Sequence, residues 1–150
     1  MASKIRVLIA DDVAATRENI GKLMEFHPEI EIVGQAGTGA EAVSQAKVLR
    51  PDIVLMDINM PEMDGIAATE RLTVEAPETS IIIMSVQGEQ EYLRRAMMAG
   101  AKNYLTKPFT GDELVGAIKQ AFIRDQKVRD TARTAAGIKI PGRIISVFSS

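Results

Sequence analysis

Short apolar runs alternate with helical patterns along most of the chain. The runs are four to six residues long, and turn residues bound them. Continuous apolar runs of this length are typical of strands that are buried on both faces of a sheet. The pattern therefore predicts five strands, at residues 5–10, 31–36, 53–56, 80–85 and 103–106.

A helical pattern follows each run, with apolar side chains three or four positions apart. The predicted helices cover about residues 14–26, 39–49, 65–75, 89–99 and 111–124. Strands that alternate with helices form a parallel sheet, because each right-handed crossover lays a helix on one face of that sheet. We therefore expect a three-layer α/β/α domain over residues 4–124.

The pattern changes after residue 124. Residues 125–142 show no apolar periodicity that could form a core, and they contain Gly137 and Pro141. We expect a helical extension that passes into a linker. Residues 143–150 are rich in β-branched side chains and are predicted to form a strand, either the first of a truncated downstream domain or a tail.

Composition narrows the class of protein. The chain has 150 residues, 46% of them hydrophobic and 25% charged, which is typical of a globular domain. No apolar stretch is long enough to cross a bilayer, so we expect a cytoplasmic protein that does not bind membranes. The absence of cysteine excludes disulfides and thiol chemistry, and a net charge of -2 argues against nucleic-acid binding by this segment.

Three carboxylates are predicted to meet at one edge of the sheet. Asp11 and Asp12 follow the first run, and Asp57 follows the third. In a doubly wound sheet these strands are neighbours, and ligands bind at their carboxyl ends. Two carboxylates about 4 Å apart repel each other by about 4 kcal/mol at an effective dielectric of 20. Mg²⁺ suits such oxygen ligands and leaves room for the Asn59 backbone carbonyl, whereas helix capping is the alternative role of Asp11 and Asp12.

Ser85 and Lys107 end the fourth and fifth runs at the same predicted edge. A serine hydroxyl can donate a hydrogen bond to an anion, and a lysine binds phosphate as a point charge. Lys107 is therefore expected to pair with Asp57 and later with a phosphoryl oxygen. The alternatives are a turn serine and a solvated lysine.

Taken together, these residues resemble the signature of response-regulator receiver domains. The motifs that carry the resemblance are Asp11-Asp12, Asp57, Met60-Pro61-Glu62-Met63-Asp64-Gly65, Ser85 and Lys107-Pro108. The resemblance covers residues 4–124 and implies a flavodoxin-like (CheY-like) fold, with a five-stranded parallel sheet in the order 2-1-3-4-5. It implies a response regulator of a two-component system, in which Asp57 accepts a phosphoryl group from a sensor histidine kinase. Such a domain is a regulatory phosphoacceptor rather than an enzyme, and it catalyses only its own Mg²⁺-dependent phosphotransfer and dephosphorylation.

The resemblance also implies individual roles within the site. The metal ligands would be Asp11, Asp12, Asp57 and the Asn59 carbonyl, and the phosphoryl oxygens would be bound by Ser85 and Lys107. Tyr104 stands where the family carries an aromatic side chain that fills space behind the moving serine; an ordinary half-buried tyrosine is the alternative. Val86 follows Ser85 where a smaller residue is common, so we expect altered phosphotransfer or dephosphorylation kinetics.

The output of the predicted switch has several candidates. In the family, the fourth helix, fifth strand and fifth helix contact an output domain or partner protein, and a second copy of the chain is a further candidate partner. Residues 142–150 resemble the first strand of ParA/MinD-type ATPases, which implies a fused ATPase. A stand-alone receiver and a DNA-binding output are the alternatives.

Two unrelated classes share parts of this pattern. A haloacid-dehalogenase-type phosphohydrolase also uses an aspartate and Mg²⁺, but its nucleophile belongs after the first strand, where this chain has Asp11-Asp12-Val13. A flavodoxin-like carrier shares the fold, but an acidic crevice would repel the flavin phosphate.

Overall fold

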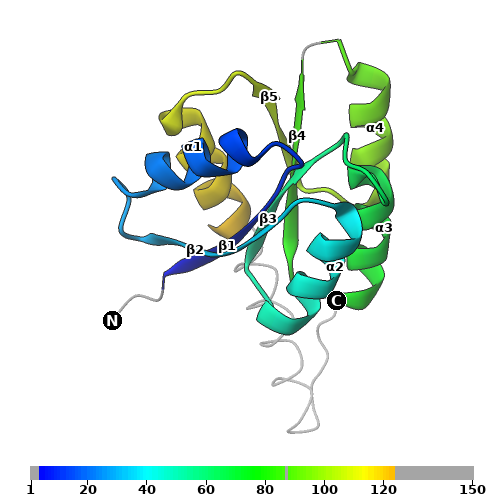
Figure 1. Cartoon of the computed structure of the whole chain (residues 1–150), viewed down its shortest axis with the longest axis horizontal. Helices are drawn as coiled ribbons and strands as arrows, with labels where there is room; N and C mark the ends of the chain where they lie inside the picture. The colour runs from blue at the N-terminus through cyan, green and yellow to red at the C-terminus, as the bar shows by residue number, and fades with distance from the viewer. Residues whose placement is uncertain (1–3, 87, 124–150) are drawn as a thin grey trace, which may run out of the picture.

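One parallel sheet lies between two layers of helices (Figure 1). The computed structural model describes residues 4–86 and 88–123. The strands are β1 (Ile5–Ala10), β2 (Ile30–Ala36), β3 (Ile53–Asp57), β4 (Ser80–Val86) and β5 (Asn103–Lys107). The helices are α1 (Ala14–Met24), α2 (Gly39–Leu49), α3 (Gly65–Glu75), α4 (Gln90–Ala99) and a fifth helix at residues 111–123. The sheet order is β2-β1-β3-β4-β5, which confirms the predicted fold and strand order.

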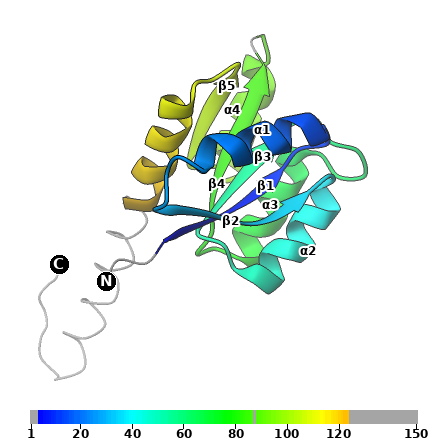
Figure 2. The same ribbon diagram turned by 60° about the vertical axis from the view of Figure 1, so that its left-hand side comes forward.

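Different helices cover the two faces of the sheet (Figure 2). Val7 and Ile9 of β1 belong to the core beneath α1 and the fifth helix, whereas Leu8 and Ala10 belong to the core beneath α2, α3 and α4. This alternation arises because successive side chains of a strand point to opposite faces. Strand β3 is buried along its whole length, which explains its continuous apolar run.

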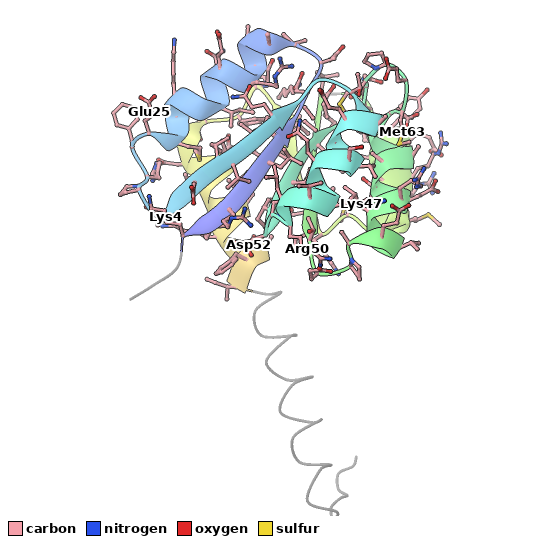
Figure 3. The ribbon with its side chains drawn as sticks, turned by 60° about the horizontal axis from the view of Figure 1, so that its bottom comes forward. Lys4, Glu25, Lys47, Arg50, Asp52 and Met63 are labelled. Carbon is pink, nitrogen blue, oxygen red and sulfur yellow. The ribbon has the colours of Figure 1, made fainter. Side chains whose placement is uncertain are left out.

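The two ends of the sheet differ in their chemistry. Lys4 and Asp52, which precede β1 and β3, lie at one end, and Met63, which follows β3, lies at the other (Figure 3). At the first end, the Arg6 backbone N–H donates to Asp52 Oδ2 at 2.9 Å, and the Arg6 guanidinium donates to the Leu49 carbonyl at 2.8 Å. The polar residues that follow the strands lie at the opposite, carboxyl end.

Side-chain caps define the starts of α2, α3 and the fifth helix, where Thr110 Oγ1 accepts from the Glu113 N–H at 3.0 Å. Thr38 Oγ1 accepts from the Glu41 N–H at 3.0 Å before α2, and Asp64 Oδ1 accepts from the Ala67 N–H at 2.9 Å before α3. Each cap satisfies an N–H that the first turn of a helix leaves without an intrahelical partner. The bounds of α2 and α3 agree with the prediction, whereas α4 begins one residue later than predicted.

The first helix is shorter than predicted. Helix α1 ends at Met24, not at Phe26. The Phe26 side chain is 81% exposed, so no apolar contact favours another helical turn. The prediction of a helix through residue 26 was therefore wrong by two residues.

The predicted linker at residues 125–142 and the predicted strand at residues 143–150 lie outside the described residues. Within residues 4–86 and 88–123, none of the helices has the length and apolar character that a membrane span requires.

Candidate functional site

Four neighbouring strands deliver polar side chains to the carboxyl edge of the sheet. Asp11 follows β1 directly, and Asp57 is the last residue of β3. Ser85 is the penultimate residue of β4, and Lys107 is the last residue of β5. Because β1, β3, β4 and β5 are adjacent and parallel, their ends meet in one place.

Lys107 bridges two buried carboxylates. Its Nζ lies 2.8 Å from Asp11 Oδ2 and 3.1 Å from Asp57 Oδ1. Asp11 is fully buried and Asp57 is 7% exposed. The lysine therefore provides a positive charge to two acidic groups that water scarcely reaches.

Asp12 completes a cluster of three carboxylates. Asp11, Asp12 and Asp57 each offer an oxygen, and these oxygens lie within 4.8 Å of one another. Asp12 is exposed, so the cluster opens to solvent on its side. Neither Asp11 nor Asp12 caps α1, which was their alternative role. The N-cap of this helix is Val13, and no side-chain hydrogen bond caps it. Asp11 Oδ1 instead accepts from the Val13 N–H at 2.9 Å, within the turn.

Burial changes the proton affinity of the Asp57 carboxyl. It raises the pKa of the Asp57 carboxyl to about 6, an increase that Lys107 opposes and the charge on Asp11 reinforces. Burial by itself would lower the pKa of Lys107. Its hydrogen bonds to Asp11 and Asp57 outweigh that effect and raise the pKa above its ordinary value. Near neutral pH the site thus holds an ammonium group and an Asp57 carboxylate that readily accepts a further cation.

A glycine lets the turn after β3 close tightly. The Gly65 N–H donates to the Ile58 carbonyl at 2.7 Å, which brings the start of α3 against the end of β3. A Cβ atom at Gly65 would clash with the Asp57 backbone carbonyl. Gly65 therefore permits the close approach that fixes the Asp57 backbone.

Ser85 and Tyr104 differ in exposure. Ser85 is buried at 3% exposure, whereas Tyr104 is 48% exposed and pairs with Ile83 across β4 and β5. Tyr104 is therefore about half exposed, whereas Ser85 is almost inaccessible to solvent. The peptide bond between Lys107 and Pro108 is cis.

Sequence reasoning missed two residues that organise the site. The Arg17 guanidinium of α1 donates to the Asp11 backbone carbonyl at 2.6 Å. The Glu89 carboxylate accepts from Asn59 Nδ2 at 2.7 Å and from the Val86 N–H at 3.0 Å. No motif or spacing signals these contacts: Asn59 and Glu89 lie 30 positions apart in the chain, and the bond from Arg17 goes to a backbone carbonyl six positions earlier.

Comparison with known proteins identifies the family. Residues 7–119 match the family described as "Response regulator receiver domain". The chain is 36% identical over 118 residues to the response regulator GacA of Pseudomonas aeruginosa, a match that covers 79% of this chain and 55% of that protein. It is also 36% identical over 143 residues to protein-glutamate methylesterase/protein-glutamine glutaminase 2 of Carboxydothermus hydrogenoformans, covering 94% of this chain and 40% of that protein.

A solved structure agrees with this match. The response regulator domain of Thermotoga maritima CheB is 34% identical and aligns with a TM-score of 0.74, covering 79% of this chain and 96% of that domain. The chain spans about half the length of the curated relatives, 50% of DegU from Brevibacillus brevis and 55% of GacA. Since the family match covers most of the chain, this protein belongs to the response-regulator receiver domain family.

Proposed function

We propose that Asp57 accepts a phosphoryl group from the phosphohistidine of a sensor histidine kinase and that this modification switches an output. The observation that carries the proposal is the position of Asp57, which is buried at a strand end beside Lys107 and within a cluster of three carboxylates. Receiver domains of response regulators partner with histidine kinases and output domains, so the family supports this assignment.

The chemistry requires a nucleophilic oxygen in a fixed position. Asp57 Oδ forms a bond to phosphorus as the bond from phosphorus to the histidine nitrogen breaks, and the imidazole leaves. Phosphoryl transfer depends more on positioning and charge neutralisation than on covalent help from the protein. The buried end of β3 supplies the positioning, because Gly65 packs directly against the Asp57 backbone.

The acidic cluster fits Mg²⁺. Receiver domains bind this ion in an acidic pocket, and the three carboxylates of this chain are hard oxygen ligands within reach of one another. We propose Asp11, Asp12 and Asp57 as side-chain ligands, with the Asn59 backbone carbonyl. The bound ion would supply positive charge that offsets the repulsion between the carboxylates and the incoming phosphoryl oxygens.

Lys107 and Ser85 are the proposed donors to the phosphoryl group. Lys107 already lies 3.1 Å from Asp57, so its ammonium group can move from a carboxylate oxygen to a phosphoryl oxygen over a short distance. Ser85 is one residue beyond Met84, which pairs with Asp57 across β3 and β4. Its hydroxyl is therefore well placed to donate as well.

Movement of Ser85 is the proposed start of the switch. An acyl phosphate carries more charge and more acceptor oxygens than a carboxylate, so it attracts the Ser85 hydroxyl. We propose that Tyr104, now 48% exposed, then turns into the space behind the serine. To shift a two-state population from 1:99 to 99:1, the phosphoryl contacts must favour the active state by about 5.5 kcal/mol.

The proposed output surface comprises α4, β5 and the fifth helix. It exposes Tyr92, Met98 and Tyr104, and the Arg95 guanidinium lies 5.8 Å from the Tyr92 ring centroid. Exposed aromatic and methionine side chains with an arginine are typical of surfaces that bind proteins. A downstream domain, a partner protein and a second copy of the chain are the candidates for this surface.

The identity of the output is a separate proposal. We propose residues 4–124 as the receiver and residues 125–142 as a linker. The resemblance of residues 142–150 to the first strand of ParA/MinD-type ATPases supports a fused ATPase as the output. The sequence of the full-length gene tests this, since a glycine-rich loop with a lysine directly after Ser150 would support the ATPase and its absence would contradict it.

Labelling with a small phosphodonor tests the main proposal. Acetyl phosphate loses acetate as its phosphoryl group moves to Asp57, and intact mass spectrometry detects the adduct. We expect Mg²⁺-dependent labelling of the wild type and none of Asp57→Asn. Asp112→Asn is the matched control, since it removes an exposed carboxylate from the fifth helix and should label normally.

The rival hydrolase predicts a different result. A haloacid-dehalogenase-type enzyme would turn over a generic phosphate ester, whereas a receiver keeps the phosphoryl group on Asp57. Steady hydrolysis of p-nitrophenyl phosphate that Asp57→Asn abolishes, without a detectable adduct, would contradict the proposal.

A further inference from the structure

The Glu89 carboxylate joins the two loops that flank Asp57. One oxygen accepts from Asn59 Nδ2 at 2.7 Å, and the other accepts from the Val86 backbone N–H at 3.0 Å. Asn59 lies two residues after Asp57, and Val86 lies one residue after Ser85. A single carboxylate thus ties the loop after β3 to the end of β4.

These bonds are not ordinary helix capping. Glu89 is the N-cap residue of α4, where a carboxylate usually accepts from N–H groups of its own first turn. Its side chain makes no such bond and turns back toward the site instead. The contact therefore links the start of α4 to the loops around Asp57.

The register of the sheet places these donors at the edge that carries Asp57. Asp57 pairs with Met84 across β3 and β4, and the Ile58 N–H donates to the Met84 carbonyl at 3.2 Å. The segments that follow β3 and β4 consequently leave the sheet side by side. The Val86 N–H and the Asn59 amide are thus donors that flank the phosphoacceptor.

We propose that Glu89 is a positioning residue that opposes phosphorylation of Asp57. A phosphoryl group brings acceptor oxygens and negative charge to this edge, so it competes with the Glu89 carboxylate for the same donors and repels it. Glu89 holds the Val86 N–H and the Asn59 amide in the unphosphorylated form and releases them when the phosphoryl group arrives. The inference rests on the proposed function, because it requires Asp57 to be the phosphoacceptor.

Release of Glu89 also couples phosphorylation of Asp57 to the position of α4. The helix begins at Gln90, the next residue, so the same two bonds tie the start of α4 to the loops around Asp57. When those bonds break, the start of α4 is free to move relative to β3. The charge of one side chain thus couples the site to the proposed output surface.

Labelling rates test the competition. The initial rate of Mg²⁺-dependent labelling by acetyl phosphate is compared between wild type, Glu89→Gln and Glu89→Ala. Loss of a charged, partly exposed hydrogen-bonding group should speed labelling on the order of threefold to tenfold. The control is Glu91→Gln, which removes the same charge from the first turn of α4, where Glu91 is exposed and pairs with Arg94 at 2.6 Å. It should label at the wild-type rate.

A second measurement tests the contact itself. Amide hydrogen exchange of Val86 in the unphosphorylated protein should be at least about threefold faster in Glu89→Gln than in wild type, with Ile83 in the middle of β4 unchanged. Equal Val86 exchange, or a Glu89→Gln labelling rate at or below that of wild type, would overturn the inference. If wild type is labelled on Asp57 but the Glu89 variants have the same labelling rate and Val86 exchange rate as wild type, this inference fails and the proposed function stands. If Asp57 is not labelled, the proposed function fails with it.

Discussion

The Lys107 ammonium group lies 3.1 Å from Asp57 Oδ1, although 50 positions separate the two residues in the chain. The contact exists because β3 and β5 flank β4 in parallel and end at the same edge. The same ammonium group lies 2.8 Å from Asp11 Oδ2. The Lys107 ammonium group is therefore shared between two buried carboxylates. Changes to this site should alter both the stability of the protein and the reactivity of Asp57.

Replacing Lys107 by methionine should destabilise the protein when no divalent cation is present. The change leaves Asp11 and Asp57 buried without a counter-ion, and removing one partner of a partly buried pair costs about 2 kcal/mol or more. Urea unfolding measures the free energy of unfolding. Lys102→Met, which removes a lysine from an exposed position before β5, is the matched control and should change this free energy by less than about 0.5 kcal/mol. Equal losses in the two variants would contradict the bridging role of Lys107.

Stability without Mg²⁺ should depend on the ionisation of Asp57. The pKa of this carboxyl rises from 3.8 to about 6 on folding, chiefly through burial. A raised pKa contributes stability that is fully present below the unfolded value and is lost as the pH rises through the folded value. Wild type should therefore lose up to about 3 kcal/mol between roughly pH 4 and pH 7 from this group. Asp57→Asn should lack that loss. If urea unfolding gave the two proteins free energies of unfolding that change with pH in the same way, the pKa shift of Asp57 would be refuted.

Gly65→Ala should distort the turn after β3. A Cβ atom there meets the Asp57 carbonyl, which is backbone and cannot move aside cheaply. We expect a loss of about 1 to 3 kcal/mol in the free energy of unfolding and slower labelling of Asp57. Gly116→Ala is the control, because nothing lies within 4 Å of a Cβ atom at that position in the fifth helix. It should stabilise the protein by about 0.5 to 1 kcal/mol, and a similar gain for Gly65→Ala would contradict the packing argument.

Val86→Ala should raise the rate of labelling by acetyl phosphate. The branched side chain is 48% exposed at the end of β4, next to Ser85, and we expect it to narrow the approach to Asp57. Val74→Ala removes a side chain that is 80% exposed near the C-terminal end of α3, whereas Gly65 at the other end of this helix packs against Asp57, so its labelling rate should equal that of wild type. Identical rates for wild type and Val86→Ala would show that this residue does not restrict access.

The sequence predicted the fold because its patterns are local. The apolar run that leads to Asp57 appears as β3, fully buried, and the helical patterns at residues 39–49 and 65–75 appear as α2 and α3. Strand ends are also readable from sequence, and the parallel order then brings Asp11, Asp57 and Lys107 together.

The remaining features depend on individual side-chain contacts. The bond between Glu89 and Asn59 joins residues 30 positions apart, and the bond from Arg17 reaches the Asp11 backbone carbonyl across the turn before α1; no periodicity encodes either contact. The end of α1 was placed too late because Phe26 is apolar yet exposed. The apolar character of a residue such as Phe26 does not show whether the fold provides an apolar surface for it to pack against.

The central claim is that Asp57 itself carries the phosphoryl group. Borohydride reduces an acyl phosphate to an alcohol, so a phosphorylated aspartate becomes homoserine, and peptide mass spectrometry then locates it in the sequence. After incubation with acetyl phosphate and Mg²⁺, we predict homoserine at position 57 and unchanged aspartate at positions 11 and 12. Homoserine at position 11 or 12, or none at position 57 in a protein that carries the phosphoryl adduct, would contradict the account.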